Sequence, residues 1–127
     1  MAESDNMREG PRVLIVEDND DAREMLALLL ERRGFRVKTA ADGSVGVETA
    51  LGQTFDAAVV DIGLPGLDGY EVARRLRADE RSAGMRLVAL SGYGRAEDRE
   101  RSTEAGFDRH LVKPVDPDEL CALLDGK

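Results

Sequence analysis

The sequence predicts an α/β fold: a doubly wound, five-stranded parallel sheet whose strands alternate with five helices. The first observation is a set of short apolar runs, rich in β-branched residues and bounded by Gly, Pro or acidic residues, which are typical of strands buried on both faces. The second is that segments with helical spacing of apolar residues separate these runs. Because each connection then carries a helix, we expect the strands to be parallel.

Five segments are expected to form strands. The stretch at residues 55–61, Phe-Asp-Ala-Ala-Val-Val-Asp, is nearly continuous in apolar residues and ends at Asp61, shortly before Gly and Pro. Residues 35–39 instead alternate apolar with polar side chains, which favours an edge strand exposed on one side. The other expected strands are residues 12–16, 86–90 and 109–112.

The first, second and fourth expected helices differ in how much apolar surface they can bury. The first is expected to stop at Gly34, and its apolar face is formed by Ala22, Met25, Leu26, Leu29 and Leu30. The second, near residues 43–51, shows only a narrow face of small residues. The fourth, near residues 95–105, is polar all round with only alanines to bury, so we expect it to be among the least rigid elements.

The third and fifth helices carry clearer start signals. Asp68 and Glu71 form a capping-box-like pair before an apolar side that includes Val72 and Leu76. Asp116 and Pro117 supply a cap and a first-turn proline to the last helix.

The composition indicates one acidic domain. The chain has 127 residues and a net charge of -8, which argues against nucleic-acid binding because that needs a basic patch. No stretch approaches the ~20 apolar residues of a membrane span. A single cysteine, Cys121, excludes an internal disulfide, so we expect a cytoplasmic protein. Residues 1–10 are expected to form a flexible tail and residues 11–125 the folded domain.

Polar side chains stand where the expected strands end. Glu17 and Asp18 follow the first strand, Asp61 ends the third, Ser91 follows the fourth and Lys113 follows the fifth. A polar side chain at the end of a single strand needs no functional explanation, because caps and turns also use such residues. The carboxyl ends of parallel strands meet at one edge of the sheet, where ligands bind in open α/β folds. The whole set at one edge therefore indicates a functional site.

The chemistry of this set favours a metal-assisted phosphoryl transfer. Three carboxylates in one pocket repel each other, and oxygen ligands without a nearby His or Cys select Mg²⁺ or Mn²⁺. A carboxylate beside such an ion can act as a nucleophile toward phosphorus and form an aspartyl phosphate. Lys113 and the hydroxyl of Ser91 would then neutralise and hydrogen-bond the phosphoryl oxygens.

Four motifs occur in a fixed order: V-L-I-V-E-D-N, V-V-D-I-G-L-P-G-L-D-G, A-L-S-G and L-V-K-P. In these motifs the chain resembles the receiver domains of two-component response regulators, which include the chemotaxis receivers. The similarity spans about residues 12–124. It implies a flavodoxin-like (βα)5 fold with strand order 2-1-3-4-5.

The resemblance also implies roles for the residues of the site. Asp61 would be phosphorylated by the phosphohistidine of a histidine kinase or histidine phosphotransfer protein. Mg²⁺ would be held by Asp18, by Asp61 and by the backbone carbonyl of Gly63, with Glu17 acting through water.

On the same basis, Lys113 would pair with the phosphoryl group, and its bond to Pro114 is typically cis in this family. Ser91 would move toward the phosphoryl group and draw in the switch residue of the fifth strand, which is His110 in this chain.

Two positions depart from the family pattern. His110 stands where Tyr or Phe is most common, so its smaller polar ring changes the size and the pH sensitivity of the switch. Gly63, two residues after Asp61, has no side chain that could position a hydrolytic water. We expect Tyr93 to shield the site instead, so that Tyr93→Ala changes the lifetime of the phosphoryl group.

The expected function is therefore a phosphoacceptor receiver domain that switches the face formed by its fourth helix, fifth strand and fifth helix, without independent enzymatic turnover. No effector domain fits after residue 125, so we expect a single-domain regulator or, as the alternative, a receiver module cut from a hybrid sensor kinase. Residues 89–99 and 105–116 resemble the receivers attached to such kinases. The expected partners are the phosphodonor and an unidentified downstream protein. Neither nucleic-acid binding nor membrane insertion is expected, and the chain should be a monomer or a weak dimer.

Three alternative functions are disfavoured by particular residues. A Mg²⁺-dependent phosphatase with an aspartyl nucleophile typically has a second Asp at the position of Gly63. A flavin- or nucleotide-binding protein needs a glycine- or hydroxyl-rich loop after the first strand, where residues 17–21 are acidic or Asn and would repel phosphates. A receiver that has lost phosphorylation and acts only as an adaptor is disfavoured by the intact set of strand-end residues.

Overall fold

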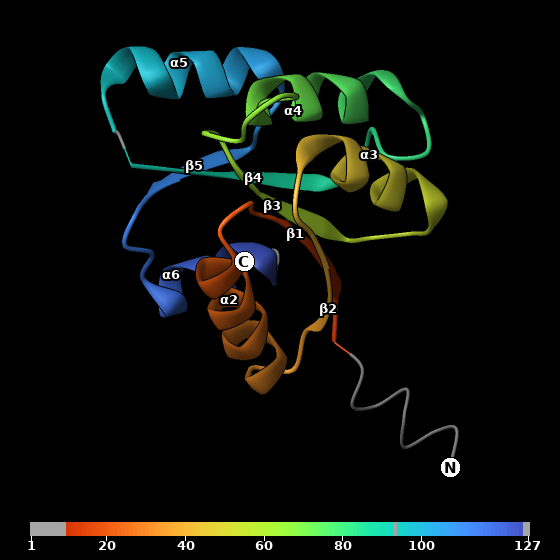
Figure 1. Ribbon diagram of the computed structural model, residues 1–127, viewed down its shortest axis with the longest axis vertical. Helices are drawn as coiled ribbons and strands as arrows, with labels where there is room; N and C mark the ends of the chain where they lie inside the picture. Colours follow the sequence, from red (N-terminus) through yellow and green to blue (C-terminus); the bar gives the residue numbers. More distant parts are fainter. Residues whose placement is uncertain (1–9, 93, 126–127) are drawn as a thin grey trace.

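A computed structural model describes residues 10–92 and 94–125, and within them five parallel strands alternate with five helices (Figure 1). The strands are β1 (Arg12–Val16), β2 (Arg36–Ala40), β3 (Ala57–Asp61), β4 (Arg86–Ser91) and β5 (Arg109–Val112). The helices are α2 (Asp20–Arg32), α3 (Gly43–Gly52), α4 (Gly69–Ala78), α5 (Ala96–Ala105) and α6 (Pro117–Leu124). The strand order β2-β1-β3-β4-β5 confirms the predicted fold class and topology.

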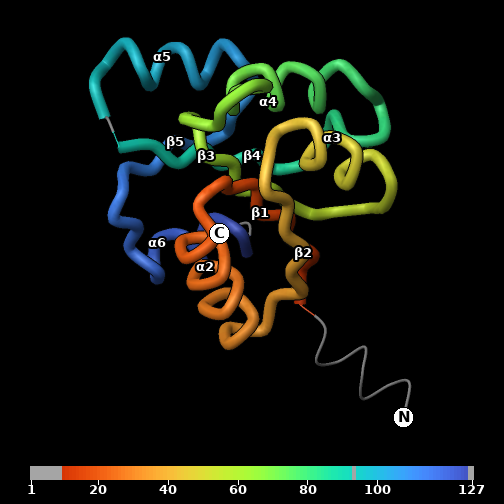
Figure 2. The backbone as a smooth tube through the Cα atoms, in the orientation of Figure 1, coloured from red at the N-terminus to blue at the C-terminus, as the bar shows by residue number. Residues whose placement is uncertain are grey.

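Two layers of helices cover the sheet. Helices α3, α4 and α5 lie on one face, and α2 and α6 lie on the other, as the path of the chain in Figure 2 also shows. Side chains that alternate along each strand therefore enter two separate cores. Leu14 and Val60 pack into the first core, whereas Ile15 and Val59 pack into the second.

The central strand β3 is buried along its whole length, which explains its nearly continuous apolar sequence. Its register places Asp61 opposite Leu90 of β4, while Val16 of β1 lies opposite Val60. The residues that follow β1, β3 and β4 therefore emerge at the same edge of the sheet.

The helix boundaries follow from local capping chemistry. The Asp68 side chain accepts a hydrogen bond from the backbone N–H of Glu71 at 3.0 Å, and the Asn19, Asp42 and Asp116 side chains cap α2, α3 and α6 in the same manner. Gly34 ends α2 with a φ of 96°, a left-handed conformation that favours glycine.

The predicted apolar face of α2 is wrong at two positions. Met25 is 70% exposed and Ala22 is also exposed, while Leu30 is buried and Leu26 and Leu29 are half-buried. The side of α2 that packs on the sheet is a stripe through Leu26, Ala27 and Leu30, spaced by three and four residues. The helix is therefore rotated relative to the face that apolarity alone suggested.

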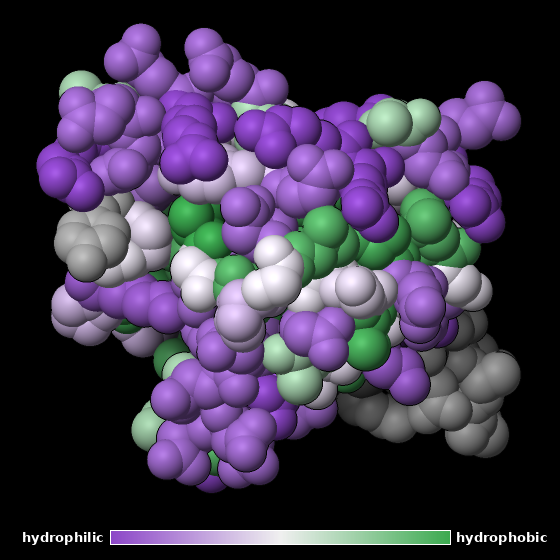
Figure 3. Space-filling model, turned by 45° about the horizontal axis from the view of Figure 1, so that its top comes forward, coloured by the Kyte–Doolittle hydropathy of each residue, from purple (hydrophilic) through white to green (hydrophobic). Residues whose placement is uncertain are grey.

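The expectation that α5 buries only alanines is also wrong. Its buried residues are Ser102 and Ala105, whereas Ala96 is exposed. The outer surface over α5 is strongly hydrophilic (Figure 3, upper left). The helix is thus held by little apolar surface, and one of its two buried positions carries a hydroxyl.

The predicted tail lies outside the described residues except for Gly10, and Tyr93 lies outside them as well. Among the residues that the structure describes, no helix has the length and apolar character needed to cross a bilayer.

Candidate functional site

Three carboxylates gather at the carboxyl edge of the sheet. Glu17 and Asp18 follow β1 and Asp61 ends β3, and one oxygen of each lies within 4.8 Å of the others. Glu17 and Asp61 are buried, whereas Asp18 is exposed. The structure thus brings together the three acids that the sequence placed at this edge.

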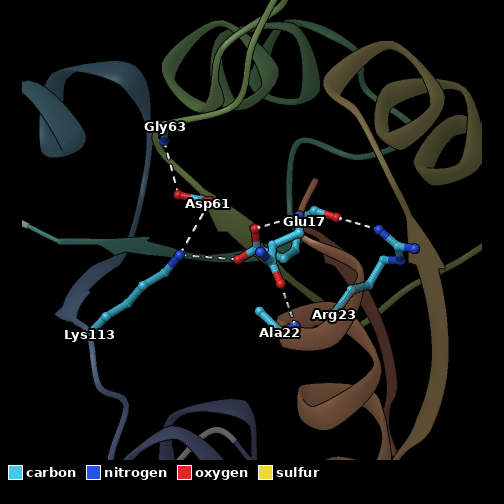
Figure 4. Close-up of polar contacts among 7 residues, drawn as sticks. Glu17, Ala22, Arg23, Asp61, Gly63 and Lys113 are labelled. Atoms are coloured by element: carbon cyan, nitrogen blue, oxygen red, sulfur yellow. Dashed lines mark hydrogen bonds and ion pairs between the residues drawn. The ribbon is translucent and has the colours of Figure 1, made fainter.

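Lys113 reaches this cluster from the end of β5. Its Nζ donates to Oε1 of Glu17 at 3.1 Å and to Oδ2 of Asp61 at 3.3 Å. Figure 4 shows both carboxylates directed toward this nitrogen. The peptide bond between Lys113 and Pro114 is cis, as the family resemblance implied.

Backbone groups fix the two buried acids. The N–H of Glu17 donates to the carbonyl of Ala40, and Oε2 of Glu17 accepts from the N–H of Asn19 at 3.1 Å. Oδ1 of Asp61 accepts from the N–H of Gly63 at 2.9 Å (Figure 4). Because α2 starts directly after Asn19, the same turn that caps the helix also orients Glu17.

Burial and the close approach of these charged groups shift the pKa values of Glu17 and Lys113. Burial raises the pKa of Glu17, and the neighbouring Asp61 carboxylate adds to the rise, although bonds from Asn19 and Lys113 oppose it. Burial works to lower the pKa of Lys113, but its hydrogen bond to Glu17 and the charges of Asp61 and Glu17 outweigh burial and raise that pKa. Lys113 therefore stays positively charged beside the acids.

This arrangement fits a hard divalent cation. The converging atoms are carboxylate oxygens, with no imidazole or thiolate within the described cluster, and such donors suit Mg²⁺. A cation would also offset the repulsion that raises the pKa of Glu17.

Ser91 and His110 lie next to this cluster. Ser91 ends β4, one residue beyond Leu90, which stands opposite Asp61. Its Oγ is 2.7 Å from Nε2 of His110, and both residues are buried. The sequence paired these two residues, and the structure places them in direct contact.

Sequence reasoning missed Ser102. Its hydroxyl lies 2.7 Å from Nδ1 of His110 and is buried under α5. Ser102 lies 11 positions after Ser91 on a polar helix, and its neighbours in the sequence do not indicate that it is buried. The periodicity of α5 would have identified it only if the rotation of that helix about its axis had been known.

The fold and the edge site together define a class: doubly wound α/β domains with an acidic, lysine-completed site at the carboxyl ends of the strands. A family model of the response regulator receiver domain matches residues 13–125. The chain belongs to this family, and the sequence-based assignment is confirmed.

Individual relatives agree with the assignment. The chain is 35% identical over 112 residues to the DNA-binding dual master transcriptional regulator RpaA of Synechocystis sp., covering 88% of this chain and 46% of that protein. It is 42% identical over 115 residues to the transcriptional activator protein PfeR of Pseudomonas aeruginosa, covering 91% of this chain and 37% of that protein. The chain thus spans less than half the length of these regulators.

A solved structure supports the fold. The receiver domain of the sensor histidine kinase PA1611 from Pseudomonas aeruginosa, described with a magnesium ion coordinated in its active site cleft, is 36% identical. It superposes with a TM-score of 0.85, covering 92% of this chain and 96% of that chain.

Proposed function

We propose that Asp61 accepts a phosphoryl group from the phosphohistidine of a histidine kinase or histidine phosphotransfer protein. The observation that carries this proposal is the convergence of Glu17, Asp18 and Lys113 on the Asp61 carboxylate at the edge of the sheet. An acid alone at a strand end is common, but three acids with a charged lysine among them is the arrangement that phosphoryl transfer to a carboxylate needs.

In the proposed step, a carboxylate oxygen of Asp61 forms a bond to phosphorus while the bond from phosphorus to the donor imidazole nitrogen breaks. The bonding electron pair leaves with that nitrogen. Lys113, 3.3 Å from Asp61, carries the positive charge that balances the phosphoryl oxygens. The N–H of Gly63 holds the carboxylate in its orientation through Oδ1.

Mg²⁺ fits the donor set described above. Asp18, Asp61 and the backbone carbonyl of Gly63 would hold the ion, and Glu17 would act through water; Mn²⁺ is the alternative ion. When bound, the ion neutralises charge on the transferring phosphoryl oxygens.

The output surface would be the face formed by α5, β5 and α6, switched through Ser91 and His110. Contacts on this face support the proposal, because the His110 ring bridges Ser91 at the site to Ser102 of α5. A weakly packed α5 is suited to a change of population after phosphorylation. Its downstream protein target is unidentified.

The proposal is tested by incubating the protein with Mg²⁺ and a small phosphodonor and measuring its intact mass. We expect one phosphoryl adduct, which Asp61→Asn removes because an amide is not a competent nucleophile. Chelation of the metal should also prevent the adduct. Asp68→Asn is the matched control, because asparagine keeps the helix cap and Asp68 is not part of the acid cluster.

An adduct that persists in Asp61→Asn would place the phosphoryl group elsewhere and overturn the proposal. Steady release of phosphate from the donor, without an adduct, would instead indicate the Mg²⁺-dependent phosphatase, for which Gly63 lacks the second carboxylate.

We place this domain in a cytoplasmic single-domain response regulator, acting as a monomer or weak dimer. A receiver module within a hybrid sensor kinase is the second candidate, favoured by the 36% identity to the receiver of the PA1611 sensor histidine kinase. The full reading frame of the parent gene distinguishes the two.

A further inference from the structure

The side chain of His110 is held at both ring nitrogens. Nε2 lies 2.7 Å from Oγ of Ser91, and Nδ1 lies 2.7 Å from Oγ of Ser102. All three side chains are buried, and they come from three successive elements, β4, α5 and β5. A continuous hydrogen-bond chain therefore runs from the phosphoryl site to α5.

The hydrogen of Ser102 indicates which nitrogen carries the ring proton. Oγ of Ser102 also lies 3.0 Å from the carbonyl oxygen of Asp98, which can only accept. If the single hydroxyl hydrogen of Ser102 is donated there, Oγ must accept from His110, so Nδ1 carries the proton. In the neutral ring Nε2 is then an acceptor, and Ser91 must donate its hydroxyl hydrogen to it.

This arrangement conflicts with the role proposed for Ser91. A phosphoryl oxygen accepts hydrogen bonds, so Ser91 must turn its single hydrogen from Nε2 toward the phosphoryl group. An unprotonated Nε2 would then lose the hydrogen that Ser91 donates to it, and losing a hydrogen bond between two buried side chains is costly.

We propose that His110 takes up one proton at Nε2 when Ser91 donates to the phosphoryl group on Asp61. The proton comes from solvent and forms an N–H bond that donates to a lone pair of Ser91 Oγ. The Ser91 hydrogen stays on its oxygen and points at the phosphoryl group. His110 thereby positions the Ser91 hydroxyl, and the inference rests on the function proposed above for Asp61.

The surroundings of His110 permit this protonation. A cleft of about 330 Å³ is lined by His110 and Ser102, so water can approach the ring. Charged residues line this cleft from the neighbouring elements: Arg99 from α5, Asp108 just before β5, Arg109 at its start and Glu119 from α6. Lys113, beyond the end of β5, is directed to the acid cluster instead.

Of these, Arg99 opposes the added charge most directly, because its Nη1 donates to the His110 carbonyl at 3.2 Å. Arg109 and Glu119 are exposed to solvent, and the Asp108 carboxylate is paired with Arg77 at 2.9 Å. Phosphorylation replaces the single negative charge of Asp61 with the nearly double charge of a phosphoryl group, which favours a new positive charge one side chain away.

The experiment uses the fact that His110 is the only histidine in the chain. Correlation of its ring nitrogens with its carbon-bound protons by NMR identifies the tautomer and the protonated ring without ambiguity. At pH 7.5 we expect the neutral ring with the proton on Nδ1 in the free domain. With Mg²⁺ and beryllofluoride, a phosphoryl mimic, we expect the doubly protonated ring.

A second measurement follows from reciprocity between the two binding events. If the mimic takes up one proton, its apparent affinity should weaken by up to about tenfold for each unit of rising pH. The pH dependence of the mimic itself is removed by comparison with His110→Phe, which keeps a ring but cannot take the proton. The ratio of the apparent affinities of the unchanged protein and the His110→Phe variant for the mimic should therefore change with pH.

Ser102→Ala tests the role of Ser102 in fixing the tautomer. It removes the acceptor for Nδ1–H with little change of volume, so the Nδ1–H tautomer should lose its preference and proton uptake should fall. Thr103→Ala is the matched control, because the Thr103 hydroxyl makes the same type of bond, to the Arg99 carbonyl at 3.0 Å, on the exposed side of the same helix. It should leave the His110 signals unchanged.

The inference is overturned if the free domain carries the proton on Nε2, or if the ring stays neutral while the mimic is bound. Failure of the mimic to bind at all, with no adduct on Asp61, would instead contradict the proposed function. The NMR spectra and the intact-mass assay together distinguish the two failures.

Discussion

Gly69 keeps Asp61 in place through close backbone contact. A Cβ atom at this position would lie 2.5 Å from the carbonyl oxygen of Asp61 and 2.8 Å from Cα of Ile62. The first residue of α4 therefore presses directly on the peptide that carries Asp61, which only glycine allows. Gly69 thus packs the start of α4 directly against the backbone of the site.

We expect Gly69→Ala to destabilise the domain by about 1–3 kcal/mol, the usual cost of overpacking. Because the clash can be relieved only by moving backbone, the position of Asp61 should shift and the rate of adduct formation should fall as well. Urea unfolding and the intact-mass assay measure the two effects.

Gly52→Ala is the control for this substitution. Gly52 ends α3 with open space around it, so alanine there should be neutral or slightly stabilising. If Gly69→Ala behaved like Gly52→Ala in both assays, the backbone contact would have no part in holding Asp61.

The site residues differ in how far the sequence could predict them. Glu17, Asp61, Ser91 and Lys113 follow buried strands, and parallel pairing brings strand ends together whatever the details of packing. Ser102 could not be found in this way, because its position depends on the rotation of a polar helix about its axis. That rotation is decided by tertiary contacts, which local sequence does not encode.

At the scale of elements, helix starts are predicted better than helix faces. Asp68 and Asp116 cap their helices as expected, because a cap is a contact among neighbours in sequence. Helical spacing predicts Met25 on the packed side of α2, but it is exposed, because apolar residues surround much of that helix and hydropathy does not select among them.

Helix α5 combines several weak features. Its N-cap is Arg95, which makes no side-chain capping bond to the described first turn, and a positive side chain there opposes the helix dipole. An Arg101 guanidinium 4.3 Å from the centroid of the Tyr70 ring is one of the contacts that join α5 to α4. A helix held in this way should open more readily than α4.

Arg95→Ser should therefore stabilise α5 by about 1 kcal/mol, because serine can accept a hydrogen bond from the first turn and the unfavourable charge is removed. The exposed ion pairs of Arg95 with Glu97 and Asp98 contribute little that would be lost. Slower amide hydrogen exchange in α5, without change in α4, is the expected result.

Asp42→Ser provides the comparison, since it exchanges one capping residue for another at α3 and should leave exchange there almost unchanged. Unchanged exchange in α5 of the Arg95→Ser protein would mean that opening of this helix is not controlled at its N-terminus.

At the scale of the whole molecule, the topology was predictable because few arrangements connect parallel strands through helices. The sequence does not reveal which side chains join distant loops. Arg77, near the end of α4, donates to the carbonyls of Ala83 at 2.7 Å and Gly106 at 2.8 Å, and to Oδ2 of Asp108 at 2.9 Å. It also donates to the carbonyl of Met85.

One guanidinium thus ties the end of α4 to the loop before β4 and to the turn between α5 and β5. Asp108 extends the connection, because its Oδ2 also accepts from the N–H of Leu87 in β4 at 2.8 Å. These loops lie at the end of the sheet opposite the acid cluster, since they precede β4 and β5. The contact therefore stabilises the fold without touching the site.

We expect Arg77→Met to destabilise the domain by about 2 kcal/mol, because methionine keeps the helix propensity but leaves several carbonyls and Asp108 without their shared donor. Arg75→Met is the matched control on the same helix: Arg75 is 55% exposed and pairs only at 3.4 Å with Glu71, so its loss should cost less than about 0.5 kcal/mol. Urea unfolding of both variants measures the difference. Equal urea midpoints for the two variants would show that the Arg77 contacts add no more stability than a surface ion pair. A lower midpoint for Arg77→Met, with an unchanged adduct on Asp61, would separate the stability of the fold from the chemistry of its site.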